Sequence, residues 1–122
     1  MMEDLPRVLH KREAKKTPEV LAMYNHSCAI ELKQTKTLSL PANSLTIHQH
    51  KALMKVKHGV LRHKIPDMGR ENPFDAFILA GLPAYVVVIF GDNTIIEIDI
   101  DAFPPIDQKL TKENALRIGR VL

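Results

Sequence analysis

The chain has 122 residues, of which 45% are hydrophobic and 25% are charged, as in an ordinary globular domain. The single cysteine, Cys28, excludes an internal disulfide and a cysteine-based zinc site. No apolar run approaches the roughly 20 residues that a membrane-spanning helix needs, and the charged N-terminus does not resemble a signal peptide. We therefore expect one domain over residues 1–122, no membrane association and a cytoplasmic location.

The net charge of +3 is unevenly distributed along the chain. Residues 1–64 hold twelve lysines and arginines against five acidic residues, whereas residues 65–122 hold five against nine. The first half is therefore basic and the second half acidic. A basic half attracts a polyanion such as DNA, although a solvated surface of varying charge accounts for the same numbers.

In chain order, the first predicted element is a short helix over residues 4–16, which Asp4 caps and Thr17-Pro18 ends. Residues 20–24 (VLAMY) are expected to form a strand, and residues 28–35 the returning strand of a hairpin.

The next predicted helix begins at Ser44 or Thr46 and ends at His58-Gly59, with the glycine as its stop. Four of its apolar residues are expected to face the core: Ile47, Leu53, Met54 and Val56.

The second half is predicted to contain three strands and a C-terminal helix. Its most apolar run, YVVVIF, suits a strand that is covered on both faces. Before it lies a loop with a basic beginning (Arg62, His63 and Lys64), which either contacts phosphates or is simply solvated. The expected ranges are a loop over 62–73, strands over 74–79, 85–90 and 94–100, and a helix over 111–120.

In the last of these strands, isoleucines alternate with Glu97, Asp99 and Asp101. We interpret this acidic face as a solvated strand face that discourages edge pairing, in preference to a metal site. The element order α-β-β-α-β-β-β-α predicts a compact α/β domain with a mixed β-sheet flanked by helices.

The strand over residues 28–35 carries the pattern Glu31-Leu32-Lys33. Because successive strand side chains alternate between faces, Glu31 and Lys33 share one face. A carboxylate there can hold a hard cation such as Mg²⁺, and an amine can stabilise charge on a phosphate or an attacking water. The simpler interpretation is a surface ion pair on a charged strand face.

Further residues are candidates to complete a site around Glu31. Glu19 stands twelve residues earlier, where the predicted hairpin brings it close to Glu31. A third carboxylate is expected from the first helix, with Glu13 preferred over Glu3. Gln49 belongs to the following helix, where a solvated position is the alternative.

Pro18-Glu19, a hairpin, Glu31-Leu32-Lys33 and a helix with Gln49 resemble the PD-(D/E)xK nuclease superfamily, in particular its Holliday-junction-resolvase-like branch. The resemblance covers residues 13–101 and uses short motifs. It implies a restriction-endonuclease-like fold in which Glu19 and Glu31 bind Mg²⁺, or Mn²⁺ as a substitute. It also implies Lys33 as the catalytic lysine and Gln49 as a residue that orients water or phosphate. Glu19 departs from the pattern, because the family usually has aspartate there.

This resemblance implies a metal-dependent endonuclease that hydrolyses DNA phosphodiester bonds, at branched DNA such as a Holliday junction, and acts as a homodimer. The alternative is a non-catalytic nucleic-acid-binding module on the same fold, which the irregular first acid and the basic half suit. A protein-interaction role is a third interpretation, which no motif singles out.

Overall fold

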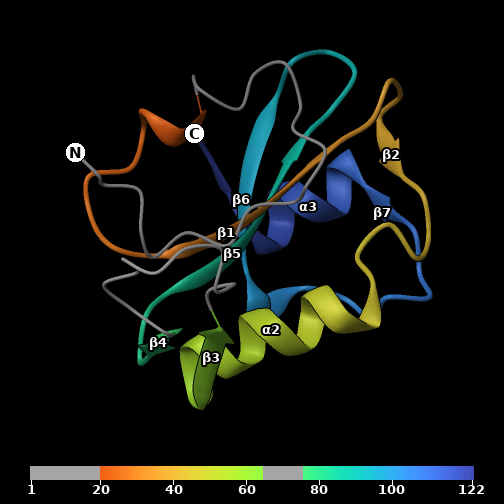
Figure 1. Cartoon of the computed structure of the whole chain (residues 1–122). Helices are drawn as coiled ribbons and strands as arrows, with labels where there is room; N and C mark the ends of the chain where they lie inside the picture. Colours follow the sequence, from red (N-terminus) through yellow and green to blue (C-terminus); the bar gives the residue numbers. More distant parts are fainter. Residues whose placement is uncertain (1–19, 65–75) are drawn as a thin grey trace.

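A computed structural model of the chain describes residues 20–64 and 76–122, and its main sheet is built around strand β5 (Ala84–Ile89) (Figure 1). β5 is apolar and almost wholly buried because side chains pack over both of its faces, while a strand pairs with each of its edges. Strand β1 (Ala29–Gln34) pairs with β5 in parallel, and β6 (Ile95–Asp99) pairs with it in antiparallel. The short strand β8 (Arg120–Val121) follows β6, so the strand order is β1-β5-β6-β8.

Two helices cover one face of this sheet. Helix α2 (Ile47–His58) buries Leu53 and Val56 there, and helix α3 (Lys112–Ile118) buries Ala115. These side chains pack against alternate residues of the sheet, namely Ala29, Val86, Val88, Ile96 and Ile98.

The opposite face of the sheet carries a second apolar cluster. Its buried members are Val20, Cys28, Ile30, Leu32, Val87, Ile89 and Ile95. Because Ile30 and Leu32 point to this face, Glu31 and Lys33 point to the face that α2 covers. The sheet therefore positions the Glu-x-Lys pair beneath a helix.

Two smaller antiparallel pairs complete the described structure. Strand β3 (Val60–Lys64) pairs with β4 (Ala76–Ala80), and β2 (Ser39–Leu40) pairs with β7 (Leu110–Thr111). A short 3-10 turn, η1 (Ile100–Ala102), follows β6. No helix within residues 20–64 and 76–122 is long and apolar enough to cross a membrane.

Several predictions are confirmed by these elements. The structure is a mixed α/β domain. Strand β6 lies within the range expected for it, and β5 begins and ends one residue earlier than expected. Helix α2 has Thr46 as its N-cap, which is one of the two predicted starts. Gly59 is its C-cap, as predicted. Within α2, Leu53 and Val56 are buried as expected, but Ile47 is 56% exposed, so its predicted inward position is wrong.

The predicted hairpin between residues 20–24 and 28–35 is wrong. Val20 and Leu21 are helical, and the N–H groups of Met23 and Tyr24 donate to the carbonyls three residues earlier. The apolar run favours a strand locally, but here a helical turn buries Val20 completely in the cluster with Ile30 and Leu32. Tertiary burial overrides the local preference.

The loop predicted over residues 62–73 is partly wrong. Arg62, His63 and Lys64 belong to β3, where they pair with Ile78, Phe77 and Ala76 of β4. Residues 65–73 and the helix predicted over residues 4–16 lie outside the described residues. The strand expected over 74–79 corresponds to β4, two residues later at its start.

Gly91 is expected to be intolerant of substitution. A Cβ atom at this position would lie 2.1 Å from the backbone oxygen of Lys36, because the β5–β6 turn packs against the chain after β1. We expect Gly91→Ala to lower the free energy of unfolding by more than about 2 kcal/mol in urea denaturation. Gly59→Ala is the control, since its Cβ would meet its nearest atom at 3.5 Å, and it should cost clearly less. Equal losses for the two variants would contradict this packing.

Candidate functional site

Glu31, Lys33 and Gln49 form a hydrogen-bonded cluster between β1 and the first turn of α2. Gln49 Nε2 donates to Glu31 Oε2 at 3.1 Å, and Lys33 Nζ donates to Gln49 Oε1 at 3.0 Å. Lys33 Nζ also lies 3.5 Å from Glu31 Oε2 as an ion pair. The structure thus brings together three of the four residues that the sequence predicts for the site.

The position of Gln49 follows from the way α2 begins. Thr46 is the N-cap, and its hydroxyl accepts a hydrogen bond from the Gln49 backbone N–H at 3.1 Å. In return, the Gln49 side-chain oxygen accepts the Thr46 backbone N–H at 3.0 Å, which completes a capping box. Only one orientation of the amide suits all its neighbours, because its oxygen faces two donors and its nitrogen faces a carboxylate.

The cluster is largely shielded from solvent. The side chain of Glu31 is 2% exposed and that of Lys33 is 12% exposed. A buried carboxylate is costly unless it has a counter-charge and hydrogen-bond donors, and the cluster supplies both. The interpretation of Glu31 and Lys33 as a solvated surface pair is therefore wrong.

The remaining predicted acids lie outside the described residues. These acids, Glu19, Glu13 and Glu3, belong to residues 1–19. The hairpin expected to bring Glu19 to Glu31 is not formed, and Val20 packs on the opposite face of the sheet from Glu31.

A metal site needs several ligand atoms that the fold brings together. Within residues 20–64 and 76–122, no three histidine, cysteine, aspartate or glutamate side chains gather at a distance that suits a metal. In the Glu31 cluster, the described residues supply one carboxylate. Mg²⁺ commonly binds through one or two carboxylates together with waters and substrate phosphates. Within the described residues, the cluster thus offers a cation one carboxylate, and any further oxygen ligands would have to come from elsewhere.

Glu97 forms a second buried acidic site on the opposite face of the sheet. Tyr24 Oη donates to Glu97 Oε2 at 2.6 Å, and Arg120 donates through Nε and Nη2 at 3.2 and 3.0 Å. Burial and this hydrogen bond raise the pKa of Tyr24 well above its usual range. The predicted solvated edge face is wrong here, because β6 lies between β5 and β8 and Glu97 is buried.

The other two acids of the predicted stripe anchor the C-terminal end of α2. Lys57 Nζ donates to Asp99 Oδ1 at 2.6 Å and to Asp101 Oδ2 at 2.5 Å, and His58 Nε2 lies 2.8 Å from Asp101. Hydrogen bonds from Lys57 and His58 lower the pKa of Asp101, and those to Asp101 and Asp99 raise the pKa of Lys57. These residues fasten a helix end to the sheet, a contact that the sequence did not predict.

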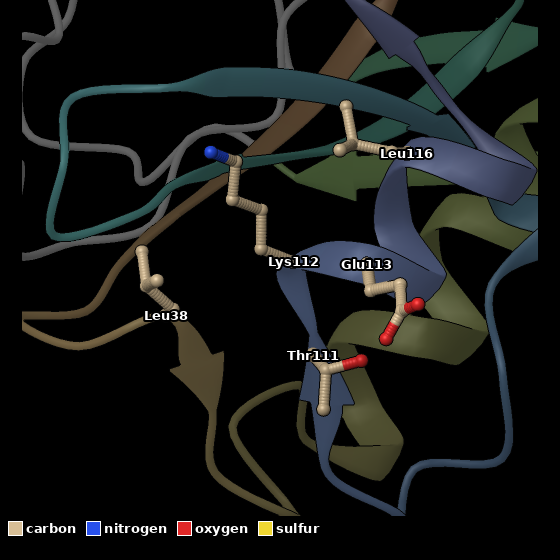
Figure 2. A pocket seen from close by; sticks show the side chains of 5 residues that line it. All are labelled: Leu38, Thr111, Lys112, Glu113 and Leu116. Carbon is tan, nitrogen blue, oxygen red and sulfur yellow. The ribbon is translucent and has the colours of Figure 1, made fainter.

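A groove of about 360 Å³ lies beside α3, and no residue of the Glu31 cluster is among those that line it (Figure 2). Figure 2 shows exposed Leu38 and Leu116 on either side of Lys112, with Thr111 and Glu113 completing the lining. The Lys112 amine is engaged with Asp92 Oδ2 at 2.6 Å, so this groove offers an apolar wall and a neutralised lysine.

A double-mutant cycle should detect the Glu31–Lys33 coupling. Lys33→Met removes an ammonium group from beside a buried carboxylate, to which Gln49 still donates a hydrogen bond. We expect a loss of about 2–3 kcal/mol in the free energy of unfolding, below the roughly 3–5 kcal/mol typical of a broken buried pair, because Gln49 still donates. Adding Glu31→Gln should recover part of this loss, with a coupling of about 1–2 kcal/mol in urea denaturation. Additive single losses would contradict the ion pair.

Asp92 should make stability depend on acid pH. The hydrogen bond from Lys112 Nζ, followed by those from Thr94, lowers the pKa of Asp92 from 3.8 to about 2. A carboxyl with a depressed folded-state pKa stabilises the fold above its unfolded pKa, and this contribution is lost as the pH falls through the folded value. We expect the difference in unfolding free energy between wild type and Asp92→Asn to shrink between pH 5 and pH 2. An unchanged difference would contradict the assignment.

No protein-family model matches the chain, and comparison with curated proteins and with solved structures gives no match either.

Proposed function

We propose that the protein is a metal-dependent endonuclease that hydrolyses DNA phosphodiester bonds. The observation that carries the proposal is the convergence of Glu31, Lys33 and Gln49, which come from β1 and α2 and lie 3.0–3.5 Å from one another. These are the residues that the resemblance to the PD-(D/E)xK superfamily singles out. On an ordinary charged strand face, nothing requires a helix residue 16 positions after Lys33 to contact both Glu31 and Lys33, as Gln49 does.

The chemistry assigns a part to each residue. Glu31 would hold Mg²⁺, or Mn²⁺ in its place, and Glu19 is the proposed second carboxylate. Such a cation supplies Lewis-acid stabilisation of the phosphate and a more acidic bound water. Lys33 carries a compact positive charge that can stabilise a phosphate oxygen, and its flexible stem lets the amine move between Glu31 and a substrate.

The proposed partner is DNA, in keeping with the basic first half of the chain. Branched DNA is the proposed substrate, and a homodimer is the proposed assembly, because a symmetric junction presents two equivalent strands to be cut. A restriction-endonuclease-like arrangement is proposed for the fold. The parallel pairing of β1 with β5 and the helix after β1 support it.

The test is a cleavage assay on four-way-junction, duplex and single-stranded DNA with Mg²⁺ or Mn²⁺. Glu31→Gln keeps the shape of the side chain but removes its charge, and we expect it to lower cleavage by at least about 10²-fold. Lys33→Met and Glu19→Gln should also lower it. Glu113→Gln, which alters an exposed glutamate of α3, is the control and should cleave normally. Folding of each variant is checked by circular dichroism, and equal cleavage by wild type and Glu31→Gln would exclude the proposal.

A non-catalytic nucleic-acid-binding module is the second candidate. It is favoured by the shielding of Glu31 and Lys33, which leaves little of either side chain accessible from solvent. In that case we expect DNA binding that weakens steeply with salt and no cleavage with either metal. Absence of both binding and cleavage would exclude both candidates.

A further inference from the structure

The beginning of α2 is joined to the Glu31–Lys33 pair through one side chain. In an ordinary capping box, the side chain at the third helical position ends at the N-cap backbone N–H. Gln49 makes this contact through Oε1, and the same oxygen also accepts Lys33 Nζ. The hydrogen bonds that start the helix and those that hold the lysine therefore share an atom.

This sharing limits what Gln49 can do. Both acceptor sites of Oε1 are used, one by the Thr46 backbone and one by the lysine, while Nε2 donates to Glu31. In this arrangement the amide oxygen has no further capacity to bind a water molecule. Through these contacts, Gln49 joins the start of α2 to both members of the Glu31–Lys33 pair.

We propose that Thr46 and Gln49 are positioning residues: the capping box fixes the Gln49 amide, and the amide holds the Lys33 ammonium beside Glu31. The catalytic consequence of this inference rests on the proposed nuclease function, whereas the ordering of Lys33 does not. Thr46 acts on Lys33 indirectly, because its hydroxyl accepts the Gln49 backbone N–H at 3.1 Å.

The chain offers a matched control at the start of α3. Thr111 is the N-cap of that helix, and its hydroxyl accepts the Asn114 N–H at 3.2 Å. Its backbone angles, φ −79° and ψ 155°, nearly equal those of Thr46, φ −78° and ψ 162°. Thr46→Ala and Thr111→Ala therefore remove the same kind of cap, but only Thr46 is connected to Lys33.

Both alanine variants should lower Tm by a similar amount, about 3–5 °C. The first readout is ¹⁵N relaxation of the Lys33 side-chain ammonium in metal-free protein, assigned with Lys33→Arg. In Thr46→Ala, the order parameter of Lys33 should fall toward that of the exposed Lys55. Thr46→Ser should restore it, and Thr111→Ala should leave it at the wild-type value. Gln49→Met should give the largest loss of order.

The second readout is cleavage of junction DNA with Mg²⁺. Thr46→Ala should lower kcat by about tenfold and Gln49→Met by about 10²-fold, with KM nearly unchanged, because misplacement of a reacting group acts on the chemical step. If Lys33 stays equally ordered in Thr46→Ala and wild type, or loosens equally in Thr111→Ala, the positioning role is excluded. Wild-type protein that cleaves no DNA would refute the nuclease instead, and the relaxation data would still decide the positioning role.

Discussion

A carboxylate buried between a sheet and a helix needs a counter-charge and a hydrogen-bond donor, and Glu31 takes these from two different chain segments. Lys33 comes with it on the same strand, because a period of two places both on one face. Gln49 has to come from α2, so the helix must begin opposite Glu31. The end of α2 is fixed separately, where Lys57 meets Asp99 and Asp101. The helix is thus held to the sheet by polar contacts at both ends and by Leu53 and Val56 between them.

Local signals predicted the parts of this arrangement that depend on neighbouring residues. The caps of α2, Thr46 and Gly59, can be recognised from residue type and position. The uniform apolar run of β5 correctly indicates a strand covered on both faces. The shared face of Glu31 and Lys33 also follows from strand geometry alone. In each case the structure depends on residues close together in the chain, so it can be predicted from the sequence.

The errors concern contacts between distant segments. β1 pairs with β5, whose residue Val86 is opposite Glu31, and no local pattern distinguishes this parallel partner from a hairpin formed by residues 20–24. The sequence predicts a solvated Glu97. Its two partners, Tyr24 and Arg120, lie 73 and 23 positions away, so no local pattern indicates that they bind it. The alternation of acids with isoleucines gave the faces of β6 correctly. Only the tertiary structure shows that Glu97 is buried, whereas Asp99 and Asp101 stay partly exposed.

The two buried glutamates are held in different ways. Arg120 binds Glu97 with two parallel hydrogen bonds, and the tyrosine hydroxyl adds a third, so this carboxylate is held by a planar fork that moves as a unit. Glu31 faces a lysine at 3.5 Å, a single point charge on a flexible stem. The Glu97 contacts therefore join β8 to β6 through a rigid fork, whereas Glu31 meets its lysine through a single flexible side chain that Gln49 also contacts.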